Sequence, residues 1–363
     1  MATTYRYLFV DLLTNQTLAE LPITGVAFTQ QLNQAGTLQG HILLGGINTE
    51  QFNVSAATQP ARNAIFVDRN GEIVWGGIIW GREYDSDSQK LSISAREFES
   101  YFEQRRINTT TSFTNTDQLT IAQNLVALAQ SAPYGNIGVI VGVETSGVLL
   151  DRTYYSYELK TFYNALQDLS RAENGFDFNI QCAYDGSGTP TKTLVLGYPR
   201  IGDVYSVSNP YAPVFQLPGN IVQYVYPEDG SITANKIYAL GAGSNEGKLI
   251  SIVEDATKYS AGWPLLETQS NYSDVTDQTY LDQLATGQVN AVSEPPAIIK
   301  VTVPAYEEPQ FGTYQIGDDA RLIIRDIRFP DGLDAIYRIV GLSVQPGEDG
   351  PERVTLTLTA TTN

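Results

Sequence analysis

The stretch ARNAIFVDRNGEIVWGGIIWGREYDSDSQKLSISA (residues 61–95) shares its plan with ARLIIRDIRFPDGLDAIYRIVGLSVQPGEDGPERVTLTLTA (residues 320–360). Each stretch begins with Ala and Arg near an apolar strand, turns at a loop that contains Gly, and continues as a long strand. That strand carries Trp-Gly-Gly-Ile at 75–78 in the first copy and Ile-Val-Gly-Leu at 339–342 in the second. An acidic loop follows, and the last strand alternates aliphatic residues with Ser or Thr. The pattern predicts a three-stranded antiparallel meander that occurs twice in the chain.

The composition is that of a soluble globular protein with sizeable cores. The chain has 363 residues, of which 42% are apolar and 10% aromatic, so we expect two or three domains. Its apolar runs are too short to span a bilayer, and residues 1–10 lack the basic start and apolar centre of a signal peptide. Cys182 is the single cysteine, which excludes an internal disulfide and a zinc site built only from cysteines of one chain.

The charge balance argues against stable nucleic-acid binding. The net charge is −18, with only 22 Lys and Arg, whereas affinity for nucleic acid comes mainly from cations that neutralise phosphates. Repulsion of DNA would be useful in a conduit, but an acidic surface is also an ordinary solubility device. The second interpretation is the more common one.

Three regions differ in composition. Residues 1–107 read as a mostly β domain that opens with a hairpin, residues 108–215 as a smaller α+β domain, and residues 216–363 as a second β domain with one helix at about 277–292. The expected fold is therefore mainly β with an α+β insertion: two β-barrel domains flank the smaller domain. Besides the helix at 277–292, we predict helices at 96–106, at about 117–132 and at 157–173.

No spacing of residues demands an enzyme. His41 is the single histidine and lies in an alternating strand pattern, so a structural role is the simpler interpretation. The loop 242–248 (AGSNEGK) almost spells a phosphate-binding loop, but Leu249 follows where Ser or Thr is needed, and a strand follows where a helix is needed. Asp85-Ser86-Asp87 resembles the start of a calcium loop without its central Gly. We read both segments as turns and predict no catalytic, cofactor-binding or metal-binding residue and no cofactor.

Paired carboxylates leave one enzymatic alternative open. A glycoside hydrolase needs only two of them, and Glu267, Asp274 and Asp277 flank Trp263 and Tyr272 in a segment that reads as a loop. An acidic aromatic loop is more often an interaction surface. A hydrolase, or an adhesin that binds carbohydrate through its tyrosines, therefore remains the minority hypothesis.

The order of several segments resembles one family. The chain is similar to the minor tail or baseplate hub proteins of long-tailed bacteriophages, a class of tail-associated proteins that share their N-terminal part with the central hub of contractile baseplates. The likeness covers nearly the whole chain and lies in these segments: 64–77 (AIFVDRNGEIVWGG), 91–106, the middle helices, 262–292, 312–322 (GTYQIGDDARL) and 337–341 (YRIVG).

The resemblance implies a virion structural protein at the phage tail tip or baseplate, without enzymatic activity or membrane insertion. Such proteins form a homotrimer in which two barrels per subunit make a pseudo-sixfold collar around a channel for DNA. The implied neighbours are the distal tail protein or tail tube protein, the tape measure protein, and receptor-binding or fibre proteins. Any cell-wall hydrolase would lie on another protein. Within the chain, Trp75, Ile78 and Trp80 would either fill a barrel or face a neighbouring subunit.

Overall fold

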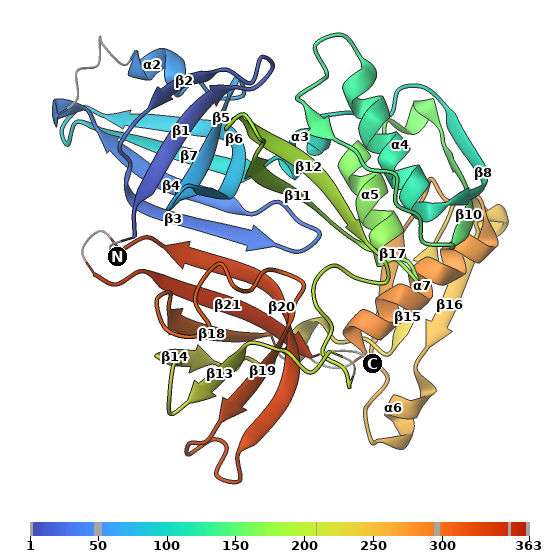
Figure 1. Cartoon of the computed structure of the whole chain (residues 1–363). Coiled ribbons are helices and arrows are strands. Elements are labelled where there is room, and N and C mark those ends of the chain that lie inside the picture. The colour runs from blue at the N-terminus through green and yellow to red at the C-terminus, as the bar shows by residue number, and fades with distance from the viewer. Residues whose placement is uncertain (1–2, 47–52, 208, 294–297, 348–349, 361–363) are drawn as a thin grey trace.

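The computed structural model describes residues 3–46, 53–207, 209–293, 298–347 and 350–360 (Figure 1). The protein is mainly β, as predicted, and one large sheet of thirteen strands runs through both ends of the chain. Smaller sheets and the longer helices lie to one side of it (Figure 1). No helix among the described residues is both long enough and apolar enough to cross a membrane.

The N-terminal part of the large sheet, here called the first lobe, has the strand order β3-β4-β7-β6-β5-β1-β2. The short helices α2 (Val54–Ala57) and α3 (Glu99–Glu103) belong to it. Its strands are β1 (Tyr5–Asp11), β2 (Thr17–Glu20), β3 (Thr24–Gln31), β4 (Thr37–Leu43), β5 (Asn63–Arg69), β6 (Glu72–Asp85) and β7 (Lys90–Glu97).

The C-terminal part, here called the second lobe, has the order β14-β18-β21-β20, with β19 beside β20 and β13 beside β19. Its strands are β13 (Val214–Leu217), β14 (Gln223–Val225), β18 (Ile299–Pro304), β19 (Asp319–Ile324), β20 (Leu333–Gln345) and β21 (Arg353–Ala360).

The two meanders have the same topology and the same irregularity. Strands β5-β6-β7 and β19-β20-β21 pair in sequence, and the register shifts between Ile79 and Gly81 in one copy and between Ile339 and Gly341 in the other. A shift at the same place in both long strands is a β-bulge. The bulge aligns residues 78–81 (IIWG) with residues 338–341 (RIVG). The sequence comparison had set 75–78 against 339–342, so its alignment of the two long strands was shifted along the chain.

The likeness extends beyond the meanders and then stops. Strand β4 pairs with β7 as β18 pairs with β21, and β3 pairs with β4 as β14 pairs with β18. The next neighbours differ, because β1 lies antiparallel to β5 whereas β13 lies parallel to β19. In the described residues the strand path has open ends at β2 and β14 and closes no barrel. The expected pair of barrels is therefore not confirmed.

One seam joins the lobes within the chain. Strand β3 pairs with β20 from Phe28↔Val344 to Gln31↔Gly341, which makes the two lobes one continuous sheet. One apolar core contains buried side chains from both lobes, including Phe28, Trp75 and Leu356. The lobes therefore share a hydrophobic core rather than only touching at their surfaces.

The helices and small sheets form a side layer with a second core. This core also takes Phe66 and Ile78 from the first lobe and Leu281 from the segment between β14 and β18. The predicted third region is thus shared between two cores, and β13 crosses the expected boundary at 215/216. The side layer consists of β8 (Thr111–Asp117), α4 (Gln118–Ser131), β9 (Val139–Ile140), β10 (Leu149–Tyr154), α5 (Phe162–Arg171), β11 (Asp177–Tyr184), β12 (Pro190–Gly197), β15 (Lys236–Leu240), β16 (Ile250–Glu254), α6 (Ala256–Ser260), β17 (Glu267–Asn271) and α7 (Gln278–Val292).

Local signals place the longer helices well. Asp117, Thr161 and Asp277 cap α4, α5 and α7 by accepting hydrogen bonds from backbone N–H groups of the first turn. The helix expected at 96–106 is only α3, and the one expected at 157–173 begins at Phe162. Pro295 and Pro296, which cannot continue a helix, follow α7 in the sequence and lie outside the described residues.

Candidate functional site: the junction between the lobes

Each of the three carboxylates considered for hydrolysis has its own structural partners. Asp277 caps α7, and Glu267 on β17 accepts a hydrogen bond of 2.6 Å from the Tyr238 hydroxyl. Asp274 is buried and binds Arg152 Nη2 and Lys160 Nζ, each at 2.6 Å. Burial alone would raise the pKa of Asp274, but Lys160 and Arg152 outweigh it and hold the pKa below its ordinary value. Asp274 therefore balances buried cations and offers no proton at neutral pH.

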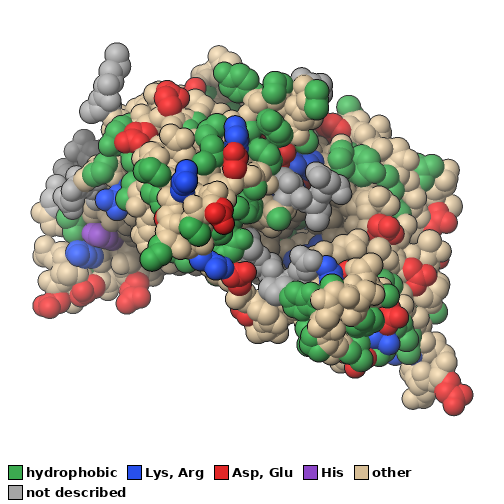
Figure 2. Space-filling view, turned by 90° about the horizontal axis from the view of Figure 1, so that it is seen from below, with side chains coloured by type: hydrophobic (Ala, Val, Ile, Leu, Met, Phe, Trp, Pro, Cys, Tyr) green, Lys and Arg blue, Asp and Glu red, His purple; other side chains and the backbone are tan. Residues whose placement is uncertain are grey.

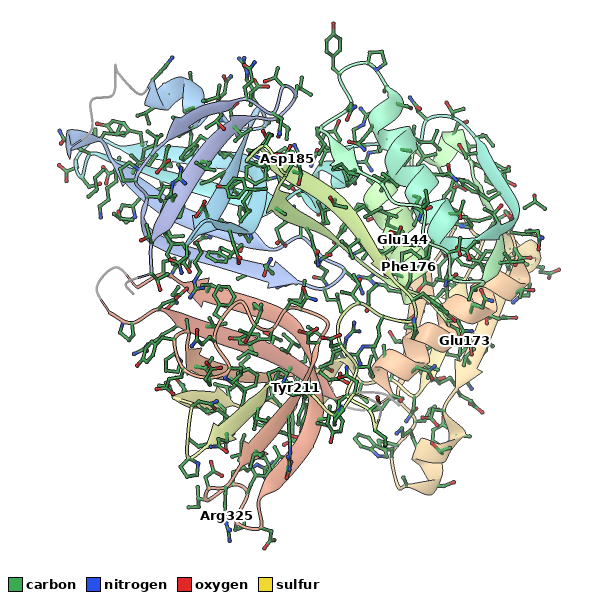
Figure 3. The ribbon with its side chains drawn as sticks, viewed as in Figure 1. Glu144, Glu173, Phe176, Asp185, Tyr211 and Arg325 are labelled. Atoms are coloured by element: carbon green, nitrogen blue, oxygen red, sulfur yellow. The ribbon has the colours of Figure 1, made fainter. Side chains whose placement is uncertain are left out.

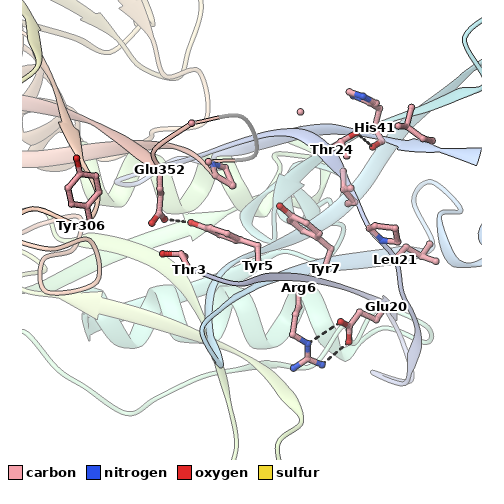
Figure 4. A pocket seen from close by; sticks show the side chains of 17 residues that line it. Thr3, Tyr5, Arg6, Tyr7, Glu20, Leu21, Thr24, His41, Tyr306 and Glu352 are labelled. Carbon is pink, nitrogen blue, oxygen red and sulfur yellow. Dashed lines mark hydrogen bonds and ion pairs between the residues drawn. The ribbon is translucent and has the colours of Figure 1, made fainter. Parts of the chain in front are cut away.

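His41 lies on the wall of a groove of about 1220 Å³ that the first lobe forms together with Tyr306 and Glu352 of the second lobe (Figure 4). Its ring packs against Gly25, which has a φ of +62°; a Cβ there would lie 2.9 Å from His41 Cε1. The acidic groups of the groove are paired: Glu20 binds Arg6 at 2.7 Å, and Glu352 accepts a hydrogen bond from Tyr5 (Figure 4). Glu352 also accepts a hydrogen bond of 2.8 Å from Arg69. The groove thus presents neutralised pairs rather than an acid and a base.

Both motif-like loops are turns. Residues 242–248 connect the antiparallel strands β15 and β16. Asp85 accepts hydrogen bonds from the Asp87 N–H at 2.9 Å and the Ser88 hydroxyl at 2.6 Å, which closes the turn between β6 and β7.

The tryptophan segment serves the interior of the chain. Trp75 is buried and donates a hydrogen bond of 3.0 Å from its indole N–H to the Thr29 carbonyl, and Ile78 is buried in the second core. Trp80 is half-buried and donates to the Ser100 hydroxyl at 2.8 Å. The sequence left open whether these side chains fill the subunit or face a neighbouring one. Trp75 and Ile78 fill the subunit.

A polar junction that the motif search missed holds the lobes and the side layer together. The tripeptide Ile-Gly-Asp occurs at 201–203, after β12, and again at 316–318, before β19. Gly202 and Gly317 have φ of +92° and +99°, and a Cβ on Gly202 would lie 2.1 Å from the Gly317 carbonyl carbon. The two backbones touch because neither residue has a side chain. The repeated tripeptide was the signal that could have found this contact.

Aspartates tie the two tripeptides to each other. The Asp203 N–H donates to Asp318 Oδ1 at 2.8 Å, and the Asp319 N–H donates to the Asp203 carbonyl at 2.9 Å. Arg200 Nη2 donates to both the Gly317 carbonyl and Asp319 Oδ1 at 2.6 Å. Asp318 and Asp319 are buried, so these hydrogen bonds satisfy acceptors that water cannot reach.

Arg338 on β20 extends the junction to the first lobe. Its guanidinium pairs with Asp177 on β11 and donates to the Ile201 carbonyl at 2.9 Å. Asp177 in turn accepts a hydrogen bond of 2.9 Å from Asn33, which lies just after β3, and the Phe178 N–H donates to Asn33 at 2.7 Å. Residues from both lobes and the side layer thus meet around one carboxylate.

A second buried corner joins the first lobe to the side layer. Glu97 accepts a hydrogen bond of 2.6 Å from the Gly36 N–H, and Glu99 accepts one of 2.5 Å from the Ile180 N–H. Burial raises the pKa of Glu99 to about 7 and also raises that of Glu97, to which the nearby Glu99 charge adds. Burial lowers the pKa of the neighbouring Lys192 to about 8. The corner is sensitive to pH near neutrality.

The outer surface mixes charged and apolar side chains. Figure 2 shows acidic, basic and hydrophobic groups interspersed on the face seen from below. Ile327 is fully exposed in the loop between β19 and β20, where Figure 3 labels Arg325 at the tip of the second lobe. Among the described residues, no three or more metal-ligating side chains lie close enough together to hold a metal ion. The contacts of the junction instead hold the two lobes and the side layer in a fixed arrangement.

Solved structures with the same fold include two tail proteins and a chain of a PdpA–VgrG complex. The chain matches the tail protein from Neisseria meningitidis at a TM-score of 0.61 and 14% identity, covering 99% of this chain and 97% of that one. It matches the 43 kDa tail protein of prophage MuSo2 from Shewanella oneidensis at 0.62 and 13%, covering 98% of each chain. It also matches a chain of the half-lidded Francisella PdpA–VgrG complex at 0.57 and 10%, covering 99% of this chain and 58% of that one.

No protein-family model matches the chain, and no curated protein matches its sequence. The structural matches confirm that the chain has the fold of these tail proteins over almost its whole length. The likeness at 10–14% identity concerns the fold.

Proposed function

We propose that this protein is a structural subunit of a phage tail tip, where it forms the hub of the baseplate as a homotrimer around a channel for DNA. The observation that carries the proposal is the internal duplication: two meanders with the same strand order and the same bulge, in a chain with a tail-protein fold. Its place would be the virion tail.

The duplication supports an adaptor role. A ring of three chains would present six similar lobes, and such a ring can join a sixfold tube to a threefold tip. The shared core and the polar junction support this role, because lobes that hold a constant mutual orientation can repeat regularly around an axis.

The partners follow from that position. The hub would contact the distal tail protein or tail tube protein above it, the tape measure protein inside it, and receptor-binding or fibre proteins around it. Acidic side chains along the channel would keep DNA from adhering, in agreement with the net charge of −18.

The role is mechanical rather than catalytic. The structural partners of Glu267, Asp274 and Asp277 support this assignment against the hydrolase alternative. No described feature favours the adhesin over the hub. A stable monomer that binds polysaccharide would support the adhesin, and polysaccharide cleavage lost on changing Glu267 or Asp274 would support the hydrolase.

The test is the assembly state, in isolation and in the particle. Native mass spectrometry of the purified chain should give a trimer, and negative-stain images should show rings with a central hole. Antibodies against the chain should label the tail tip of virions. Label on the capsid, or single copies in the mature tail, would refute the proposal.

A further inference from the structure

The seam between the lobes is a template for a contact between chains. Within the chain, β3 pairs with the second half of β20, after the bulge, along residues Gly341 to Val344. The same stretch of β20 pairs with β21 on its other side. The equivalent stretch of β6 is Gly81–Tyr84, since Gly81 and Gly341 follow the same bulge.

That stretch of β6 has an open side. Residues 81–84 pair with β7, while β5 reaches only as far as Ile78 on the other side. No strand in the described parts of the chain covers the remaining edge of residues 81–84, and Arg82, Glu83 and Tyr84 are exposed. An uncovered edge of this kind pairs readily with a strand of another chain.

The complementary edge lies at the end of the second lobe. Strand β14 is the counterpart of β3 and ends the strand path, so no described strand pairs with its outer side. Continuing its register with β18 places Tyr226 opposite Ile299, as Phe28 lies opposite Leu38 in the first lobe. The segment 226–229 is therefore the counterpart of Phe28–Gln31, and its Pro227, Glu228 and Asp229 are exposed.

We propose that residues 226–229 of one copy pair antiparallel with residues 81–84 of a second copy of this chain, so that the contact between chains repeats the seam within the chain. The contact is head-to-tail, and such contacts close into rings when the rotation allows. The proposal rests on the assembly proposed above and specifies the surfaces that make it.

The register follows from the template. The seam within the chain has four residue pairs, from Gln31↔Gly341 to Phe28↔Val344. Replacing each residue by its counterpart gives, in the same order, the pairs Asp229↔Gly81, Glu228↔Arg82, Pro227↔Glu83 and Tyr226↔Tyr84. Opposite charges therefore face each other at Glu228 and Arg82, a favourable cross-strand pair. Within the chain, Glu228 pairs with the exposed Arg328, and Arg82 donates to the Ser55 carbonyl and the Thr58 hydroxyl, so the contact between chains has to replace or share these bonds.

Proline at 227 agrees with this register. The Leu32 N–H donates to the Val340 carbonyl, so Gln31↔Gly341 and Thr29↔Ser343 are the pairs that exchange no backbone hydrogen bonds. Pro227 takes the place of Thr29, where no N–H has to reach the partner strand. A proline one residue earlier or later would remove a hydrogen bond of the seam.

Disulfide trapping tests the pairing directly. Residues in pairs without backbone hydrogen bonds have Cα atoms about 4.5 Å apart, within the range that a disulfide spans. The full-length variant with both Glu83→Cys and Pro227→Cys should give covalent oligomers on mild oxidation, up to a closed ring. Each single variant, which keeps the native Cys182, is the matched control and should remain uncrosslinked.

Charge exchange gives a second readout. Arg82→Glu and Glu228→Arg should each weaken association at least roughly tenfold, and the double variant should recover most of it. Arg321→Glu is the control: it breaks the exposed Arg321–Asp334 pair between β19 and β20 and should leave association unchanged. Circular dichroism and thermal melting check that every variant is folded.

The outcomes separate this inference from the proposed function. Rings that form without crosslinks between positions 83 and 227, or crosslinks from the Glu83→Cys variant alone, would overturn the strand pairing and leave the hub role standing. A chain that stays monomeric in solution and in the particle would overturn both.

Discussion

At the residue scale, small and acidic residues decide how the parts of the chain meet. Gly202 and Gly317 allow two backbones to touch, and Asp177 gathers Arg338 and Asn33 from two lobes. Glu97 and Glu99 hold the β3–β4 turn and β11 at one corner. These residues bear no catalytic signature, and their importance comes from where the fold places them.

Gly317 is one of the two glycines whose missing side chains let the backbones of the junction touch. Replacing it with Ala should destabilise the protein by roughly 1–3 kcal/mol, because φ is +99° and a Cβ would lie 2.5 Å from the Ile201 carbonyl oxygen. Chemical denaturation measures the change. Gly312→Ala is the control for positive φ without crowding, since φ there is +102° and nothing lies within 4 Å of the added Cβ. An equal loss in both variants would contradict a role for the backbone contact.

Glu99 should make stability depend on pH. A pKa raised from 4.5 to about 7 means that the folded state holds the proton more tightly than the unfolded state. The stability from this group is complete below pH 4.5 and is lost as pH rises through about 7, an effect on the order of 3 kcal/mol. Glu99→Gln should flatten the decline in melting temperature between pH 5 and pH 7.

The exposed Glu72 on β6 provides the matched control for this pH series. Glu72→Gln should leave the slope of melting temperature against pH as it is in the unchanged protein. Lys192 acts in the opposite sense around pH 8, where its lowered pKa lies, so the series ends at pH 7. An unchanged slope in Glu99→Gln would contradict the assignment of the corner.

At the element scale, the side layer depends on helix caps and on the strands that flank them. Asp117 ends β8 and caps α4, and its other oxygen accepts hydrogen bonds of 2.8 and 2.6 Å from the Ser146 and Gly147 N–H groups. One side chain thus fixes both the start of a helix and the loop beside it.

Asp117→Ala should destabilise the protein by about 2 kcal/mol, the upper end for a helix cap, because the loop at 146–147 loses its acceptor as well. Asp277→Ala is the comparison, since Asp277 caps α7 through a hydrogen bond of 2.7 Å to the Tyr280 N–H. It should cost about 1 kcal/mol. If chemical denaturation gives the same loss of unfolding free energy for both variants, the loop contacts of Asp117 contribute nothing to stability.

At the scale of the whole molecule, the shared core and the contacts of Arg338 with Asp177, Ile201 and Gly317 fix the orientation of the lobes. Arg338→Lys keeps the charge but loses the planar fork that reaches Asp177, Ile201 and Gly317 together. Hydrogen exchange should then quicken at residues 200–203 and 315–319 with little change at β5 and β6. Arg328→Lys, at an exposed pair with Glu228, is the control. Uniform quickening would indicate general destabilisation instead.

Assembly belongs to the same scale. If the contact between chains repeats the internal seam, loosening the junction with Arg338→Lys should lower the proportion of closed rings and raise that of open chains. The reason is that a ring closes only when each step has the same rotation. Electron microscopy counts both species, and an unchanged proportion would separate ring closure from lobe orientation.

Local sequence signals were sufficient to predict the fold class and the repeated meander. Alternation of apolar and hydroxyl residues around residues 61–95 and 320–360 specifies strands with one buried face, and Asp117 and Asp277 mark helix starts, because these signals act over a few neighbouring residues. The resemblance of ordered segments indicated the tail-protein type of fold, which the structural matches confirm.

Which distant segments meet became visible only in the folded chain. The seam from β3 to β20 joins residues about 310 positions apart, and strand β17, in a segment that reads as a loop, forms only because a neighbouring strand supplies its hydrogen bonds. Packing between remote parts of the chain also produces the backbone contact of Gly202 with Gly317 and the ion pair of Arg338 with Asp177. Such contacts leave no periodic trace in the sequence, because their free energy comes from burial and hydrogen bonding across the fold rather than from local propensity.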